Sequence, residues 1–328
     1  MGRHLLIGAG FSRNWGARVA TDIFGQLLSL PAIGDHPRLR ALLINHQSAG
    51  GFEYALSELQ SRTDAPSQQD SRTLETALQL LFARINRNLF ARNGGIEFQN
   101  RRRWMVREFL GLFDSIFTLN QDLLLEHHYV QHVELLSARK WDGAILPYMR
   151  PIPSPDNHIS DRRWSHFLWV PEEPPTLNGP NSQPIFKLHG STNWRPNSAS
   201  DLMILGGTKE TAIQQQEVLS RYFREFRAAV CTQGARVCIL GYGFGDDHVT
   251  RVLEHAMLNS ALTTFLIDTA GIDAYRRVNR SHKGSIREQN SLEDAFDLGL
   301  RGVCARELRE IFSGPNNDHD ALMDFLGS

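Results

Sequence analysis

The sequence predicts an α/β protein built on a doubly wound parallel sheet with an inserted helical module. Short apolar runs along the chain end in glycine or in a polar residue, as buried parallel strands do where they enter ligand-binding loops. Segments with helical periodicity separate these runs, which favours parallel pairing of the strands. The 328 residues are 41% hydrophobic and 22% charged, a composition typical of an ordinary folded domain.

The first predicted strand covers residues 5–7 and leads into a glycine turn that opens a helix. This turn reads Gly8-Ala9-Gly10-Phe11-Ser12. Glycines let a phosphate approach the backbone closely, and a helix start offers free N–H groups. The alternative is that the turn only packs strand against helix, since Arg13 stands where the dinucleotide fingerprint has its third glycine. Residues 17–30 are then expected to form a helix that Pro31 stops.

Residues 35–113 predict a helical insertion, so that residues 1–34 and 114–290 together make up the sheet domain. The insertion contains apolar residues at helical spacings of three and four, namely Leu74, Leu78, Leu81, Ile85 and Leu89. Further helices are expected around residues 52–59 and from Arg101 onward, with polar breaks at 61–71 and 93–95. Its arginines favour a solvated face, and the net charge of −1 leads us to expect no direct nucleic-acid binding.

A second strand at residues 115–119 ends in Asn120-Gln121-Asp122, and a helix is expected over 123–130. In a parallel sheet, ligands bind outside the carboxyl ends of the strands. There the amide of Asn120 can orient a ribose or a water, and the carboxylate of Asp122 can stabilise positive charge on a sugar. The alternative is that both residues cap the following helix.

Residues 147–184 are rich in Pro, Asn and Ser, which predicts a long irregular segment folded over the site. The strand that follows, at residues 185–188, ends in His189. With a pKa near neutrality, this histidine can act as a general base toward a ribose hydroxyl. A purely structural role is the alternative.

A helix at about 211–232 precedes a strong strand at residues 236–240, which ends in Gly241-Tyr242-Gly243-Phe244-Gly245. Tyr242 and Phe244 are candidates to stack on a base or ribose; otherwise the segment is a strand-to-helix turn with Asp246 as the helix cap. After a helix to about residue 258, a strand at 264–268 ends in Asp268, either a ligand of ribose hydroxyls or a solvated turn residue. Residues 291–328 are expected to form a strand and helices that pack on the core or make an oligomer interface.

Metal and membrane signals are weak in this chain. The three cysteines, Cys231, Cys238 and Cys304, form no paired metal motif, and His127, His128 and His132 lack companions at ligand spacing, so no metal is expected. No run approaches the roughly 20 apolar residues of a membrane span. The N-terminal residues lack the pattern of a signal peptide, and we therefore expect a cytoplasmic protein.

Taken in order, these motifs resemble the sirtuin family. The phosphate loop resembles residues 8–12, the Asn and Asp motif residues 118–122, and the histidine-glycine motif residues 187–191. Residues 241–248 are similar to those of the bacterial sirtuin-like branch found in antiphage defence systems. The resemblance implies a Rossmann-like domain that binds NAD. It also implies the site residues: His189 as general base, Asn120 and Asp122 around the nicotinamide ribose, Ser12 and the glycine loop at the phosphates, and Tyr242 and Asp268 toward the adenosine half.

Two departures from the protein-deacylating sirtuins bear on the activity. Their four-cysteine zinc module is missing, and residues 18–22 replace their Pro-Asp-Phe-Arg segment. Both departures fit the defence-type branch, whose members degrade NAD. The leading hypothesis is an NAD+ glycohydrolase that releases nicotinamide and ADP-ribose during abortive infection. A zinc-free NAD-dependent protein deacylase and a non-catalytic NAD or ADP-ribose sensor are the alternatives.

An enzyme that empties a cell of NAD has to be restrained. We therefore expect a homo-oligomer and a separately encoded partner. For that partner the defence branch offers an ATPase of the HerA helicase type or an Argonaute-type protein, and this expectation is an analogy at the level of the fold.

Overall fold

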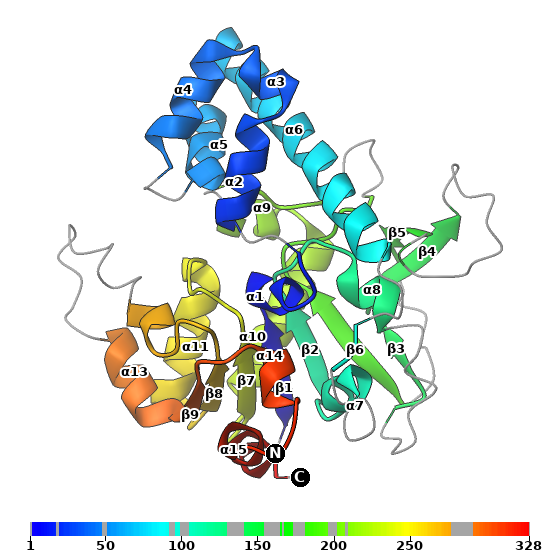
Figure 1. Cartoon of the computed structure of the whole chain (residues 1–328), viewed down its shortest axis with the longest axis vertical. Helices are drawn as coiled ribbons and strands as arrows, with labels where there is room; N and C mark the ends of the chain where they lie inside the picture. Colours follow the sequence, from blue (N-terminus) through cyan, green and yellow to red (C-terminus); the bar gives the residue numbers. More distant parts are fainter. Residues whose placement is uncertain are drawn as a thin grey trace.

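A parallel sheet of seven strands forms the centre of the computed structural model (Figure 1). The structure describes residues 2–17, 20–47, 51–91, 96–98, 105–129, 141–153, 165, 167–172, 181–195, 202–206, 209–276 and 291–327. In spatial order the strands are β3 (Gly143–Ile145), β6 (Ser182–Lys187), β2 (Ser115–Thr118), β1 (Arg3–Ile7), β7 (Arg236–Leu240), β8 (Thr263–Ile267) and β9 (Leu300–Cys304). Every neighbouring pair is parallel, which confirms the predicted α/β class.

The strand order reverses direction at β1. From β1 the chain builds outward on one side through β2 and β6, and on the other through β7, β8 and β9. The loops after β1 and β7 therefore lie side by side, and Gly8 N and Gly10 N donate to Leu240 O and Gly241 O, both at 2.9 Å. Such a reversal point is where doubly wound sheets bind ligands.

Helices cover the sheet because its strands are apolar on both faces. Leu5, Leu6 and Ile7 of β1 have no exposed surface, and aromatic rings of α10 pack against rings of β2 and β6. The helices around the sheet are α1 (Ala9–Arg13), α7 (Val106–Gly111), α8 (Leu124–His128), α9 (Lys209–Gln214), α10 (Glu217–Val230), α11 (Asp247–Asn259), α13 (Ser291–Gly299), α14 (Leu308–Ile311) and α15 (Asn317–Leu326).

Between β1 and β2 the chain forms a cluster of helices that stands above the carboxyl ends of the strands (Figure 1). This helical cluster comprises α2 (Ala20–Leu28), α3 (Pro31–Gly34), α4 (Pro37–Asn45), α5 (Gly51–Ser61) and α6 (Ala65–Phe90). The five apolar residues predicted to share one helix face are all buried along α6. Helices that the sequence places between residues 35 and 113 are thus present, and α2 and α3 precede them.

The helix expected over residues 17–30 is α2, which ends before Pro31 as predicted; Pro31 also occupies the first turn of α3, as its fixed φ and missing N–H allow. One predicted boundary in this region is wrong. The expected break at residues 61–71 ends early, because Asp64 accepts a hydrogen bond from Ser67 N and caps the start of α6. The helix expected from Arg101 begins outside the described residues, and α7 starts at Val106.

The segment predicted to be irregular contains a hairpin of β4 (Met149–Pro153) and β5 (Phe167–Pro171). Its prolines are tolerated because both strands of a two-stranded ribbon are edges. The single helix expected over 211–232 is two helices, α9 and α10, since Gln216 has an extended backbone between them. Whether the rest of residues 147–184 folds over the site lies largely outside the described residues.

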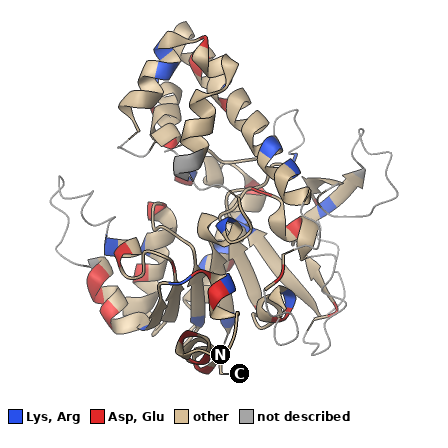
Figure 2. Cartoon of the chain, in the orientation of Figure 1, with Lys and Arg blue, Asp and Glu red and all other residues tan. Residues whose placement is uncertain are grey.

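The C-terminal segment belongs to the sheet domain. Its strand β9 extends the sheet, and Arg3 and Arg236 donate to the carbonyls of Leu326 and Phe325 at the end of α15, at 3.0 and 2.7 Å. Both termini lie at the amino ends of the strands, away from the helical cluster (Figure 1). Basic and acidic residues are interspersed over the ribbon, with acidic residues gathered on α13 (Figure 2). Among the described helices, none has the length and apolar character needed to cross a membrane.

Candidate functional site

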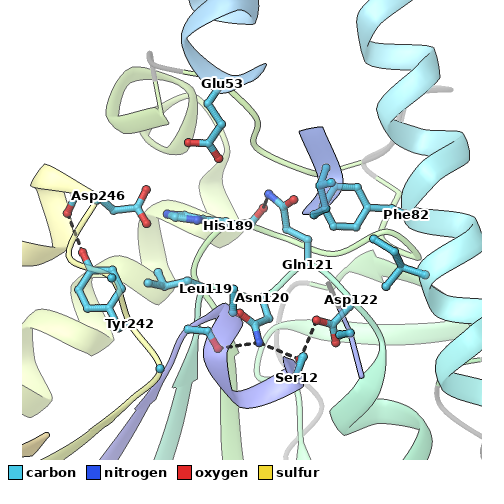
Figure 3. Close-up of a pocket in the computed structure, with 18 of the residues that line it drawn as sticks. Ser12, Glu53, Phe82, Leu119, Asn120, Gln121, Asp122, His189, Tyr242 and Asp246 are labelled. Carbon is cyan, nitrogen blue, oxygen red and sulfur yellow. Dashed lines mark hydrogen bonds between the residues drawn. The ribbon is translucent and has the colours of Figure 1, made fainter. Parts of the chain in front are cut away.

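A pocket of about 910 Å³, counting the space at its open mouth, lies at the reversal point of the sheet (Figure 3). Loops after β1, β2, β6 and β7 form its floor, and α5, α6 and α9 contribute to its walls. The residues that line it are Gly8, Ala9, Ser12, Ala17, Ile23, Phe52, Glu53, Phe82, Ile85, Leu119, Asn120, Gln121, Asp122, His189, Lys209, Gly241, Tyr242, Gly243, Gly245 and Asp246.

Asn120 is held in one orientation by two hydrogen bonds from its amide nitrogen. Nδ2 donates to Gly8 O and to Ser12 Oγ, both at 3.0 Å (Figure 3). A flipped amide would set its oxygen against the Gly8 carbonyl, which has no hydrogen to donate. The two bonds use both amide hydrogens, and the amide oxygen is therefore the group that Asn120 can offer to a ligand.

Asp122 acts through Ser12. Ser12 Oγ donates to Asp122 Oδ2 at 2.8 Å, and Leu124 N donates to Asp122 Oδ1 at 3.0 Å. Asn120 donates to Ser12, and Ser12 donates to Asp122. The carboxylate therefore orients the serine hydroxyl that accepts the hydrogen bond from Asn120. Asp122 lines the pocket as predicted, and part of its work there is to position its neighbours.

A buried ion pair beneath this loop was not predicted. Lys187 Nζ donates to the Asp122 carbonyl at 2.7 Å and to Glu126 Oε1 at 2.6 Å, and both side chains are only 2% exposed. A lysine inside the apolar run of β6 was the signal for it in the sequence. A buried charge needs a partner, and here the partner, Glu126, lies one helical turn beyond Asp122.

His189 lies across the pocket from Asn120 and is almost fully buried. Burial lowers its pKa to about 3, partly opposed by the Asp246 carboxylate, so that the imidazole is neutral at physiological pH. The expected pKa near neutrality is therefore wrong, because the sequence could not show this depth of burial. The next residue, Gly190, has φ of +75°, and a Cβ there would lie 2.0 Å from Leu202 O.

Three charged residues at the pocket were missed as functional residues. Lys209 Nζ donates to Glu53 at 2.9 Å and to Asp246 at 2.8 Å, which joins α5, α9 and the start of α11. Burial alone lowers the pKa of this ammonium, but the carboxylates of Asp246 and Glu53 outweigh it and raise the pKa. Asp246 appeared in the sequence only as a helix cap, and its side chain makes no capping bond.

The glycines divide into two groups. A Cβ on Gly8 would lie 2.4 Å from Gly241 O, and one on Gly10 would lie 2.6 Å from Gly241 Cα. Gly8 and Gly10 have to be glycine because their backbone contacts that of Gly241. This agrees with the alternative that the turn serves to pack neighbouring segments together. By contrast, a Cβ on Gly243 or Gly245 would meet nothing within 4 Å, and both line the pocket. The second loop is therefore the one that leaves room for a ligand.

Four predicted binding residues do not line the pocket: Gly10, Phe11, Phe244 and Asp268. The rings of Phe11 and Phe244 have no exposed surface, and they pack on Trp15 and Phe296 at 4.9 and 5.3 Å between centroids. Apolar residues flanking a tight turn are drawn into the core, and Phe244 is thus not placed to stack on a base.

Tyr242 and Asp268, the residues predicted to bind the adenosine half, both use their polar groups in hydrogen bonds within the protein. Tyr242 lines the pocket, but its hydroxyl is bonded to Asp246 O and to Thr250 Oγ1, both at 2.9 Å. Asp268 Oδ1 accepts a hydrogen bond from Ala270 N at 2.8 Å, the local geometry of a turn aspartate.

A comparison with known protein families shows to which family this chain belongs. A model of the SIR2-like domain matches residues 114–287, just over half of the chain. The chain belongs to the SIR2-like family. The matched region contains Asn120, Asp122, His189 and the loop after β7, so the sirtuin resemblance is confirmed at this level. SIR2-like domains are typically NAD-dependent enzymes, which supports an NAD-related activity in the broad sense. No curated protein matches the chain.

Proposed function

We propose that this SIR2-like protein is an NAD+ glycohydrolase, which cleaves NAD+ to nicotinamide and ADP-ribose. The observation that carries the proposal is the shared pocket of Asn120 and His189. These residues come from loops 69 positions apart, and both line one pocket at the reversal point of the sheet. A pocket that only stores a nucleotide does not require an asparagine locked by Gly8 and Ser12.

The chemical character of the pocket suits NAD+. Gly243 and Gly245 leave open space along the second loop, where a nucleotide can approach the backbone. Asp122 offers negative charge toward the nicotinamide cation, and Lys209 offsets the charges of Glu53 and Asp246, which would otherwise repel the diphosphate. The apolar side chains of Phe52, Phe82 and Ile85 can cover flat rings.

In the proposed reaction the bond between the ribose anomeric carbon and the pyridinium nitrogen breaks. Its electron pair moves to the ring, which leaves as neutral nicotinamide. A water oxygen bonds to the anomeric carbon and releases one proton to solvent. The Asn120 amide oxygen accepts a hydrogen bond from this water or from a ribose hydroxyl. The neutral His189 imidazole hydrogen-bonds to a ribose hydroxyl, and catalysis rests on positioning and on stabilising the developing cation.

We further propose that the protein is the toxic effector of a bacterial antiphage defence system, acts in the cytoplasm and is silent until it oligomerises or meets a partner. Free NAD hydrolysis is lethal to the host, and restraint is therefore required. Tyr54 and Leu80 on the helical cluster, 55% and 58% exposed, are the residues we propose for contact with the partner. A HerA-type ATPase or an Argonaute-type protein is the proposed partner. Co-purification with products of neighbouring genes tests this, and a strictly monomeric, constitutively active chain contradicts it.

Product analysis by chromatography tests the activity itself. The purified protein, alone and with its candidate partner, is incubated with NAD+ beside the variants Asn120→Ala and His189→Ala. Nicotinamide and ADP-ribose from the wild type, lost in both variants, establish the glycohydrolase.

Two controls separate the alternatives. Nicotinamide release only in the presence of acylated peptide would indicate a deacylase. NAD+ binding by calorimetry without turnover, even with the partner present, would indicate a sensor.

A further inference from the structure

Three potential metal ligands converge at the wall of the pocket. His189 follows β6, and Asp246 and His248 stand at the start of α11. One ligand atom of each lies within 4.8 Å of the others, and His189 Nε2 is 3.1 Å from His248 Nε2. The Asp246 carboxylate lies beside the His189 ring (Figure 3). The three side chains come from the loop after β6 and the start of α11, which the sheet brings together.

The distance between the two nitrogens fits a shared ion. Zinc binds histidine nitrogen at about 2.0–2.1 Å with tetrahedral geometry, which places two ligand nitrogens roughly 3.3 Å apart. A hydrogen bond between the two imidazoles would have a similar length. The Asp246 carboxylate is also within reach of both nitrogens, and although its Oδ1 accepts from Lys209, it adds the third ligand that a cation of the zinc class needs and a shared proton does not.

The surroundings also suit a cation. Both histidines are mostly buried, at 3% and 7% exposure. Lys209 is bonded to Asp246 Oδ1, but a carboxylate has a second oxygen. Glu53 contacts the same ammonium, so two carboxylates face one fixed positive charge.

We propose that His189, Asp246 and His248 bind one divalent transition-metal ion of the zinc class. Two histidines and one carboxylate are a common three-ligand set for such ions, and they leave a further coordination position open toward the pocket. A metal on Nε2 of His189 takes this nitrogen away from a ribose hydroxyl. The metal-loaded protein is then inhibited, a consequence that rests on the proposed NAD+ hydrolysis, whereas the binding itself does not.

Calorimetric titration of ZnCl₂ into the EDTA-treated, dialysed full chain tests the site. We expect one equivalent of Zn²⁺ to bind, and CoCl₂ to give the visible absorption of a low-symmetry cobalt site. The variants His248→Gln and Asp246→Asn should each weaken Zn²⁺ binding at least about tenfold, since even losing a partner behind a ligand costs 10–100-fold. His255→Gln, an exposed histidine on the same helix, is the matched control and should bind like the wild type.

Absence of a one-to-one Zn²⁺ complex, or equal affinity in His248→Gln and the wild type, overturns the proposal. Circular dichroism checks that each variant is folded. If His248→Gln does not fold, the Zn²⁺ affinity of Asp246→Asn is compared with that of the wild type instead. The two proposals fail separately. If the chain binds Zn²⁺ but does not hydrolyse NAD+, the metal site is supported and the glycohydrolase proposal is contradicted. If it hydrolyses NAD+ but does not bind Zn²⁺, the glycohydrolase is supported and the metal site is contradicted.

Discussion

The Asn120 amide nitrogen lies 3.0 Å from Ser12 Oγ, and Ser12 in turn donates to Asp122. This arrangement fixes which end of the amide meets a ligand. Replacing Asn120 with Ala should lower kcat for NAD+ hydrolysis at least about 100-fold, the usual loss when one polar group at a reaction centre is removed. Asn120→Asp should be similarly impaired, because it sets an oxygen against the Gly8 carbonyl. A kcat within threefold of wild type in a folded Asn120→Ala protein would contradict this role.

Ser12 supports Asn120 without being its sole anchor. Ser12→Ala removes the bond from Asn120 and the bond to Asp122, but the Asn120 amide keeps its bond to Gly8 O. Asn120 thus loses one of its two anchoring hydrogen bonds, and we expect a cost of about 1 kcal/mol, or about fivefold in kcat. Steady-state kinetics measure this. Ser29→Ala, which removes an exposed hydroxyl just after α2 that is bonded to Gly25 O, is the control and should leave kcat unchanged. A loss as large as that of Asn120→Ala would mean that Ser12 itself acts on the substrate.

The two glycine groups should respond oppositely to alanine. Gly8→Ala forces a Cβ into Gly241 O and should destabilise the fold by several kcal/mol, or prevent folding. Gly243→Ala meets open space and should leave the melting temperature unchanged, yet weaken NAD+ binding because the new methyl projects into the pocket. Thermal denaturation and calorimetry on this matched pair separate packing from ligand contact. Equal stability of the two variants would show that the loops are not in backbone contact.

Lys187 and Glu126 should show strong energetic coupling. Lys187→Met leaves a buried carboxylate without its cation and should cost roughly 3–5 kcal/mol of unfolding free energy. The double variant Lys187→Met/Glu126→Leu should recover most of that loss, since apolar residues of similar size can replace a buried ion pair. Denaturant unfolding of both single variants and the double variant completes the cycle. Additive effects would indicate that the pair contributes through packing alone.

The strand ends were predictable because they depend on local signals. Short apolar runs closed by Gly8, Asn120, His189 and Gly241 identified four of the loops that meet at the pocket. Parallel pairing then requires these loops to lie at one edge. The order of the motifs along the chain also indicated the sirtuin-like family, because recognising that order requires no knowledge of side-chain packing.

What could not be predicted depends on contacts between distant segments. Phe244 looked available for stacking, yet it is in the core, since only the assembled structure shows which face of a turn is covered. Glu53 and Lys209 are 156 residues apart and belong to elements with no visible motif. The pKa of His189 depends on burial by all of these elements together, and residue spacing does not encode it.

Lys209 holds the helical cluster to the sheet domain across the pocket mouth, through Glu53 on α5 and Asp246 before α11. In Lys209→Met the two carboxylates remain without their cation and repel the diphosphate of NAD+. We expect KM to rise about tenfold, equivalent to about 1.4 kcal/mol, with a smaller change in kcat. Adding Glu53→Gln removes one of the two negative charges and should restore part of the affinity. Raising the salt concentration should narrow the difference between Lys209→Met and wild type, because screening weakens the repulsion at this partly exposed mouth. A KM that is unchanged in Lys209→Met at low salt would show that the ion pairs only join the two parts of the fold.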